Sequence, residues 1–135
     1  MQMASDMRKR VVVIGEDDEP IANLLHDALS DADGYQAVVV SDGALVLDTV
    51  RQVQADLLIL DIMMPGLTGF EVYDRVQSDP DIKTMPVLFV SAATPQFERE
   101  FQDRGITDVV SKPFDLNDLL ERVRVLCPAD AGGSA

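Results

Sequence analysis

The stretch Leu57-Leu58-Ile59-Leu60-Asp61-Ile62-Met63-Met64-Pro65-Gly66 decides the fold, because an aliphatic run stops abruptly at a charged residue. The four leading residues do not alternate between polar and apolar types. Such a run is typical of a strand whose two faces are both covered. Pro65 and Gly66 then favour a turn. We therefore predict a buried strand over residues 57–60, with Asp61 at its carboxyl end.

Similar apolar runs lie on both sides of this strand. They span residues 11–14, 37–40 and 87–90, and a weaker run follows Gly105 at residues 108–111. Segments with helical periodicity separate the runs. Strands that alternate with helices indicate a parallel sheet joined by right-handed crossovers. We expect an α/β domain with a doubly wound sheet of five strands and five helices.

Capping residues and apolar stripes indicate the five helices. Pro20 lies in the first turn of the first helix, the second opens at Ser41 or Asp42, and Thr68 with Glu71 forms a capping box for the third. The fourth helix spans about residues 96–104, and the fifth follows Asp115. Inward-facing positions are predicted in the first helix at Ile21, Leu24, Leu25, Ala28 and Leu29, and in the second at Ala44, Leu47, Val50 and Val53.

The composition narrows the function classes. The chain has 135 residues, 47% of them hydrophobic, and its 11 basic and 24 acidic side chains give a net charge of −13. This size fits one domain, and the charge argues against direct contact with nucleic acid or an anionic membrane. A single cysteine and the lack of a long apolar run argue for a cytoplasmic protein. We expect the domain at residues 10–127, an N-terminal extension at 1–9 and a flexible tail or linker stub at 128–135.

Reactive side chains are expected where parallel strands end, because ligands of open α/β sheets bind beyond the carboxyl ends of the strands. Glu16 and Asp17 follow the first strand, and Asp61 follows the third. Ser91 ends the fourth strand, and Lys112 ends the fifth. If the first and third strands are neighbours, the three acidic residues converge.

Three carboxylates in one place repel one another, by about 1 kcal/mol per pair at 4 Å in water and about fourfold more near protein. A bound cation offsets this repulsion, and oxygen donors without histidine or cysteine favour Mg²⁺. Lys112 and Ser91 suit the oxygens of a phosphoryl group in transfer. Asp61 stands alone at its strand end and is the best nucleophile, whereas Glu16 and Asp17 look like metal ligands.

Four motifs together resemble the receiver domain of bacterial two-component response regulators, and the resemblance covers about residues 10–126. The motifs are Glu16-Asp17-Asp18, Leu60-Asp61-Ile62-Met63-Met64-Pro65-Gly66, Val90-Ser91-Ala92 and Lys112-Pro113-Phe114. The resemblance implies the strand order 2-1-3-4-5, as in flavodoxin-like folds. It also implies a signalling module rather than a metabolic enzyme, apart from self-phosphorylation by small donors and autodephosphorylation.

The resemblance implies a role for each site residue. Asp61 would accept a phosphoryl group from a sensor histidine kinase or a phosphotransfer protein. Asp17 and Asp61 would bind Mg²⁺ directly, Glu16 through water, and Met63 through its backbone carbonyl. Finally, Ser91 and Lys112 would hold the phosphoryl group, and a cis peptide bond before Pro113 would aim Lys112 at the site.

Phosphorylation would shift a two-state equilibrium and expose a partner surface. We expect this surface on the fourth helix, fifth strand and fifth helix, with Ser91 and Pro113 among the switch residues. The active form would bind a downstream protein or form a phosphorylation-dependent homodimer from a monomer. Val109 stands where the family usually carries an aromatic switch residue.

Three other functions remain open. A degenerate receiver would bind partners without phosphorylation, an alternative that Val109 motivates. A phosphohydrolase of the haloacid-dehalogenase type would need a second aspartate at position 63, where this chain has methionine. Flavodoxin-like cofactor binding is the weakest alternative, because Glu16 to Glu19 would repel a phosphate.

Overall fold

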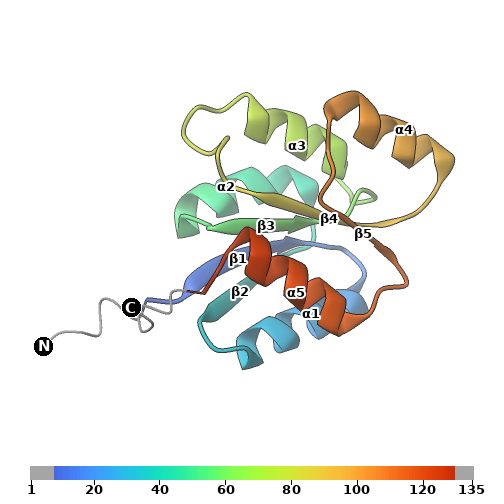
Figure 1. The fold of residues 1–135 in the computed structure, drawn as a ribbon. Coiled ribbons are helices and arrows are strands. Elements are labelled where there is room, and N and C mark those ends of the chain that lie inside the picture. The colour runs from blue at the N-terminus through green and yellow to red at the C-terminus, as the bar shows by residue number, and fades with distance from the viewer. Residues whose placement is uncertain (1–7, 130–135) are drawn as a thin grey trace, which may run out of the picture.

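The computed structural model describes residues 8–129, in which five strands alternate with five helices along the chain (Figure 1). Residues 1–7 of the predicted extension and 130–135 of the predicted tail lie outside the described residues. The elements are β1 (Arg10–Gly15), α1 (Glu19–Asp31), β2 (Tyr35–Val40), α2 (Gly43–Val53), β3 (Leu57–Leu60), α3 (Gly69–Gln77), β4 (Val87–Ala92), α4 (Pro95–Arg104), β5 (Val109–Lys112) and α5 (Leu116–Leu126).

The strands form one parallel sheet in the order β2-β1-β3-β4-β5. The predicted doubly wound fold and its strand order are therefore confirmed. Gly15 pairs in register with Val40 on one side and with Leu60 on the other, so β1, β2 and β3 end at the same level. None of the helices between residues 8 and 129 combines the length and the apolar character that crossing a membrane requires.

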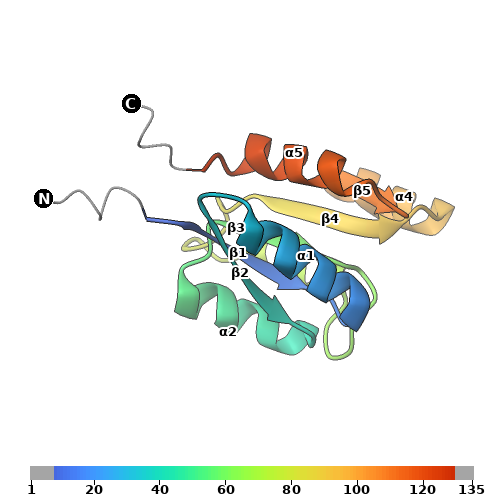
Figure 2. The same ribbon diagram turned by 90° about the horizontal axis from the view of Figure 1, so that it is seen from below.

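Two helical layers cover the sheet. Helices α2, α3 and α4 lie on one face, and α1 and α5 lie on the other, where the view from below shows them in front of the strands (Figures 1 and 2). The all-buried strand β3 contributes to both layers: Leu58 and Leu60 pack with the first group of helices, whereas Leu57 and Ile59 pack with the second. A sheet with two covered faces explains why these strands read as continuous apolar runs.

Two of the predicted helix faces are wrong in detail. Leu24 is 46% exposed rather than buried, and Ala44 is exposed while Val46 is fully buried. In α1 the buried stripe runs through Ala22, Leu25 and Leu29. Leu24 is the residue before Leu25, so its side chain points to one side of this stripe. Apolar side chains at the edge of a stripe can face either way, and only the contact with the sheet decides between them.

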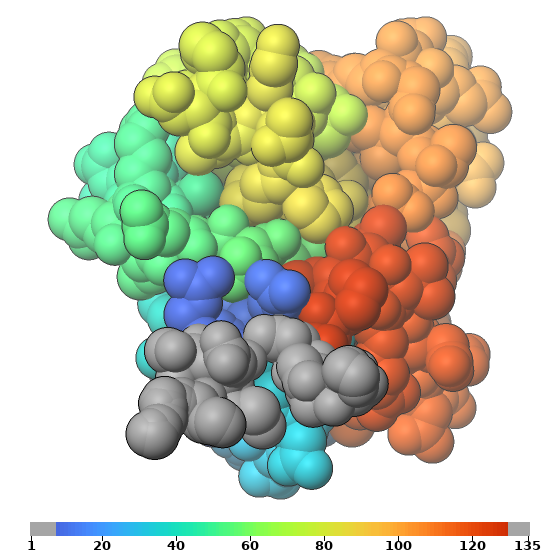
Figure 3. All heavy atoms as spheres, turned by 60° about the vertical axis from the view of Figure 1, so that its left-hand side comes forward, coloured from blue at the N-terminus to red at the C-terminus, as the bar shows by residue number. Residues whose placement is uncertain are grey.

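The ends of the described chain meet at the end of the sheet opposite the strand termini that carry the acidic residues. Arg10 Nε donates to the backbone oxygen of Pro128 at 3.2 Å, and the buried Tyr35 hydroxyl donates to that of Cys127 at 2.7 Å. Figure 3 shows this end, where the blue start of β1 lies beside the red α5. The two described residues of the predicted tail, Pro128 and Ala129, therefore lie against the body of the domain.

Candidate functional site

Glu16 and Asp17 follow β1 directly, and the sheet holds their backbone in place. The Glu16 N–H donates to the carbonyl of Val40 at 3.1 Å, which extends the β1–β2 pairing by one residue. The Glu16 side chain is 2% exposed, whereas Asp17 is exposed. Asp18 then caps α1, because its Oδ1 accepts from the Ile21 N–H at 3.3 Å.

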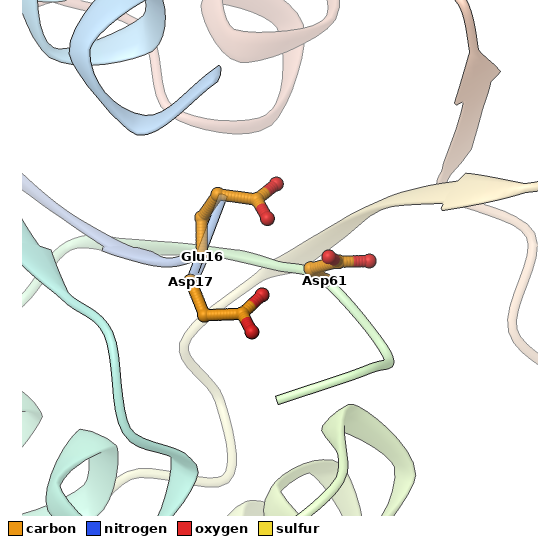
Figure 4. Close-up of side chains that lie close together, drawn as sticks. All are labelled: Glu16, Asp17 and Asp61. Carbon is orange, nitrogen blue, oxygen red and sulfur yellow. The ribbon is translucent and has the colours of Figure 1, made fainter. Parts of the chain in front are cut away.

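Asp61 follows β3 and is 8% exposed. Its N–H donates to the carbonyl of Gly15 at 2.9 Å, and its Oδ1 accepts from the Ile62 N–H at 2.7 Å. The carboxylates of Glu16, Asp17 and Asp61 therefore come together at the strand ends, with one oxygen of each within 4.8 Å of the others (Figure 4). The predicted convergence of these three residues is confirmed.

Lys112 brings the positive charge of β5 to the same place. Its Nζ lies 3.2 Å from Glu16 Oε1 and 3.2 Å from Asp61 Oδ2. Burial alone would lower the pKa of Lys112, but the charges and hydrogen bonds of Asp61 and Glu16 outweigh it and raise the pKa. The peptide bond between Lys112 and Pro113 is cis, as the family resemblance implies.

The cluster as a whole is short of positive charge. Burial raises the pKa of Glu16 to about 7, and interaction with the Asp61 carboxyl group adds to this effect, while the Asp18 N–H and Lys112 oppose it. Three carboxylates face one ammonium group, which leaves two formal negative charges. A divalent cation would balance them, and the donor set of carboxylate oxygens suits a hard ion. The residues present therefore fit a metal ion of the Mg²⁺ type.

Three other residues predicted at the site are Ser91, Met63 and Val109. Ser91, at the end of β4, is 1% exposed, and its Oγ donates to the neighbouring Ala92 carbonyl at 2.8 Å. The Met63 side chain is 64% exposed. Val109 pairs with Phe89 and borders a hollow of about 340 Å³ that Ser91 and Phe101 also line. The structure thus joins Lys112 to the acids and leaves the Ser91 hydroxyl bonded to the backbone.

Sequence reasoning missed a contact to the segment that follows Asp61. The N–H of Gly43, at the start of α2, donates to the carbonyl of Pro65 in the segment after Asp61, at 2.8 Å. A glycine directly after a helix-capping aspartate was the available signal, because the first turn of a helix has no intrinsic need for glycine.

Comparison with known sequences supports the resemblance. The family model described as response regulator receiver domain matches residues 12–124. The chain is 33% identical over 119 residues to the DNA-binding response regulator MtrA of Mycolicibacterium smegmatis, covering 87% of this chain and 50% of that protein. It is 36% identical over 133 residues to the response regulator MprA of Mycobacterium bovis, covering 95% and 56%. The chain thus spans about half the length of the curated relatives it matches.

Solved structures have the same fold. The chemotaxis response regulator CheY4 of Vibrio cholerae superposes with a TM-score of 0.78 at 28% identity, covering 87% of this chain and 98% of that one. The receiver domain of the Francisella response regulator 1452 superposes with a TM-score of 0.77 at 27% identity, covering 87% and 96%. With its sheet order, its acidic strand ends and its match to the family model, the chain belongs to the family of response regulator receiver domains.

Proposed function

We propose that Asp61 is the phosphoacceptor of this receiver domain and that its phosphorylation depends on Mg²⁺. The observation that carries the proposal is the meeting of three strand ends, which brings Asp61 within hydrogen-bond distance of Lys112 and close to Glu16 and Asp17. Receiver domains are signalling modules of two-component systems, and membership of this family supports a phosphoacceptor role for Asp61.

The transfer forms an acyl phosphate. A carboxylate oxygen of Asp61 attacks phosphorus, and the bond from phosphorus to the nitrogen of a phosphohistidine, or to the acyl oxygen of acetyl phosphate, breaks. The electron pair stays with the leaving group, which takes up a proton as required. Bound Mg²⁺ would neutralise charge on the oxygens of the transferred group. Glu16, Asp17, Asp61 and the Met63 carbonyl are the ligands we propose, with Glu16 acting through water.

The remaining residues handle the charge of the phosphoryl group. Lys112 already lies 3.2 Å from Asp61 Oδ2, so its ammonium group needs little movement to contact an added phosphoryl oxygen. The Ser91 Oγ currently donates to the Ala92 carbonyl, and we propose that it turns to donate to the phosphoryl group. Such a change of partner at β4 is one way to transmit phosphorylation to α4.

We infer the partners of this domain from its membership of the receiver family. A sensor histidine kinase or a phosphotransfer protein would supply the phosphoryl group in the cytoplasm. The output surface we propose consists of α4, β5 and α5, which lie together along the upper edge of the molecule in Figure 2. It would bind a downstream protein or a second copy of the chain. The net charge of −13 disfavours direct contact of this domain with nucleic acid.

The test is phosphorylation by acetyl phosphate in MgCl₂, followed by intact mass spectrometry. The wild-type protein is expected to gain one phosphoryl group, and EDTA is expected to prevent the gain. Asp61→Asn should abolish it, whereas Asp27→Asn, which alters an exposed carboxylate on α1, should leave it unchanged. Unmodified wild-type protein, or equal modification of Asp61→Asn, would show that the proposal is wrong.

A second experiment distinguishes the proposed switch from the degenerate-receiver alternative. The hollow beside Val109 favours it, because a small side chain occupies this position on β5. If phosphorylation succeeds, beryllofluoride should change the oligomeric state or the amide exchange of α4, β5 and α5. If the protein is phosphorylated but neither property changes, the switch is absent and the domain does not signal through this surface.

A further inference from the structure

The loop between β3 and α3, residues 61–68, carries both Asp61 and Met63. Main-chain hydrogen bonds fix its two ends, since the Asp61 N–H donates to Gly15 at 2.9 Å and the Gly69 N–H donates to Ile62 at 2.8 Å. Within the loop, Ile62 and Met64 are buried while Met63 between them is 64% exposed. The place of the Met63 backbone therefore depends on the contacts that hold the middle of the loop.

The first turn of α2 supplies such contacts. The Gly43 N–H donates to the carbonyl of Pro65 at 2.8 Å. A Cβ built on Gly43 would lie 1.9 Å from the carbonyl oxygen of Leu67 and 2.8 Å from its carbonyl carbon. Backbone this close to backbone leaves no room for a side chain, so only glycine permits the approach. Gly43 therefore contacts the loop at two places, Pro65 and Leu67.

A second glycine makes the reciprocal contact. Gly66 has a φ of +84°, and a Cβ built on it would lie 2.1 Å from Asp42 Oδ1 and 2.9 Å from the Ala44 nitrogen. The same Asp42 oxygen accepts from the Ala44 N–H at 2.8 Å and so caps α2. The start of α2 and the loop are thus in close contact at two glycines, Gly43 and Gly66.

We propose that Gly43 is a positioning residue for the cation site, an inference that rests on the proposed function of Asp61. It acts through the loop, because its contacts with Pro65 and Leu67 hold the segment in which the Met63 carbonyl lies. Helix propensity favours alanine over glycine, so the close approach to Leu67 is the physical reason for glycine here. Residues that orient metal ligands affect metal affinity even though they do not touch the metal.

The first test measures Mg²⁺ binding by calorimetry in Gly43→Ala. The added Cβ has to push the loop away, and we expect the affinity to fall by about tenfold or more. Gly105→Ala is the matched control. Gly105 has a φ of +69° and nothing within 4 Å of a built Cβ, so alanine there strains the backbone at the end of α4 without touching the loop. The control is expected to unfold at a lower temperature than wild type but to bind Mg²⁺ with unchanged affinity.

The second test uses the wild-type protein, so it tests the positioning role of Gly43 even if Gly43→Ala fails to fold. If the Gly43–Pro65 hydrogen bond positions the site, coupling is reciprocal and bound Mg²⁺ must strengthen that bond. Amide exchange measured by NMR should therefore slow at Gly43 when MgCl₂ is added. It should not change at Asn117, whose N–H donates to the capping Asp115 of α5.

The outcomes separate the two proposals. If the wild-type protein binds Mg²⁺ but Gly43→Ala binds it equally well, or if exchange at Gly43 is unaffected by saturating MgCl₂, Gly43 has no positioning role and the proposed function stands. If the wild-type protein itself binds no Mg²⁺, the proposed function and this inference both fail. A weaker affinity in Gly43→Ala alone, together with slower exchange at Gly43, supports the positioning role.

Discussion

Glu16 is a carboxylate buried in the protein interior, where a charged group is costly to the stability of the fold. A carboxylate that is 2% exposed needs strong compensation, and the structure offers one ammonium group, Lys112, which Asp61 shares. The pKa of Glu16 therefore rises to about 7, chiefly because of burial. Replacement of a buried charged group by a well-packed apolar side chain is often neutral or stabilising, so a carboxylate at this position is a cost to the stability of the fold.

Glu16 gives the metal-free protein a distinctive pH dependence. Its pKa is about 7 in the folded protein and near the ordinary 4.5 in the unfolded chain, so the folded state binds more protons between these values. The free energy of unfolding should therefore fall as pH rises from about 5 to 7 and level off above. The difference between 7 and 4.5 corresponds to about 3 kcal/mol at most. Urea denaturation in EDTA at several pH values measures it.

Comparison of two variants isolates the contribution of Glu16. Glu16→Gln keeps the shape of the side chain and does not titrate, so its stability relative to wild type should increase with pH over this window. Glu98→Gln, at an exposed position on α4, should give a curve parallel to wild type. Curves of wild type and Glu16→Gln that stay parallel from pH 5 to 8 would contradict the prediction.

The helices show which features of an element the sequence can predict. All five begin at an aspartate or threonine whose side chain accepts from the first turn, namely Asp18, Asp42, Thr68, Thr94 and Asp115. These signals are local, and the capping box of Thr68 and Glu71 was predicted and is present. The buried face is decided by contact with the sheet instead, which is why Leu24 and Ala44 were placed wrongly.

Arg104, the last residue of α4, joins this helix to α3 through polar contacts. Phe101 is the only buried residue of α4, and half of the residues in this helix are charged. The Arg104 guanidinium group forms a bidentate pair with Asp74 of α3, at 2.9 and 3.0 Å. It also donates to the Glu100 carboxylate and lies 4.7 Å from the centre of the Phe70 ring. These carboxylates raise the pKa of Arg104. The pairing therefore joins α4 to α3.

Arg104→Lys is expected to loosen α4 although it keeps the charge. Lysine cannot form the bidentate pair with Asp74 or stack on Phe70, so we expect a loss of about 1 to 2 kcal/mol in unfolding free energy. Amide exchange in α4 should become faster than in α3. Arg99→Lys, at an exposed position of the same helix, should have neither effect. Unchanged exchange in Arg104→Lys would show that Phe101 alone holds the helix.

At the scale of the whole molecule, the parallel sheet assembles the site. Residues 16, 61 and 112 are far apart in the sequence, and they meet because the strands before them end on one side. This rule of topology made the convergence of Glu16, Asp17 and Asp61 predictable from residue types at strand ends. The Gly43–Pro65 contact and the direction of the Ser91 hydroxyl were not predictable, because they depend on the packing of α2 and on a side-chain rotamer.

Binding of Mg²⁺ should raise the stability of the whole domain. An ion that binds only the folded state stabilises it by about 2.7 kcal/mol at a hundred times its dissociation constant, which shifts thermal unfolding upward by several degrees. Because the chain carries a net charge of −13, any salt also relieves general repulsion. Scanning calorimetry must therefore compare MgCl₂ with NaCl at equal ionic strength, and we expect the larger shift in MgCl₂.

Two variants assign this shift to the acidic cluster rather than to the overall charge. Asp17→Asn removes an exposed carboxylate of the cluster and should abolish the excess effect of MgCl₂. Asp61→Asn should do the same and also raise the unfolding temperature in EDTA, because it removes one of three repelling charges. Asp27→Asn changes the net charge equally but lies on α1 outside the cluster, so it should keep the full response. Equal shifts in MgCl₂ and NaCl for the wild-type protein would mean that Mg²⁺ acts only by screening, and that the acids at the strand ends do not bind it.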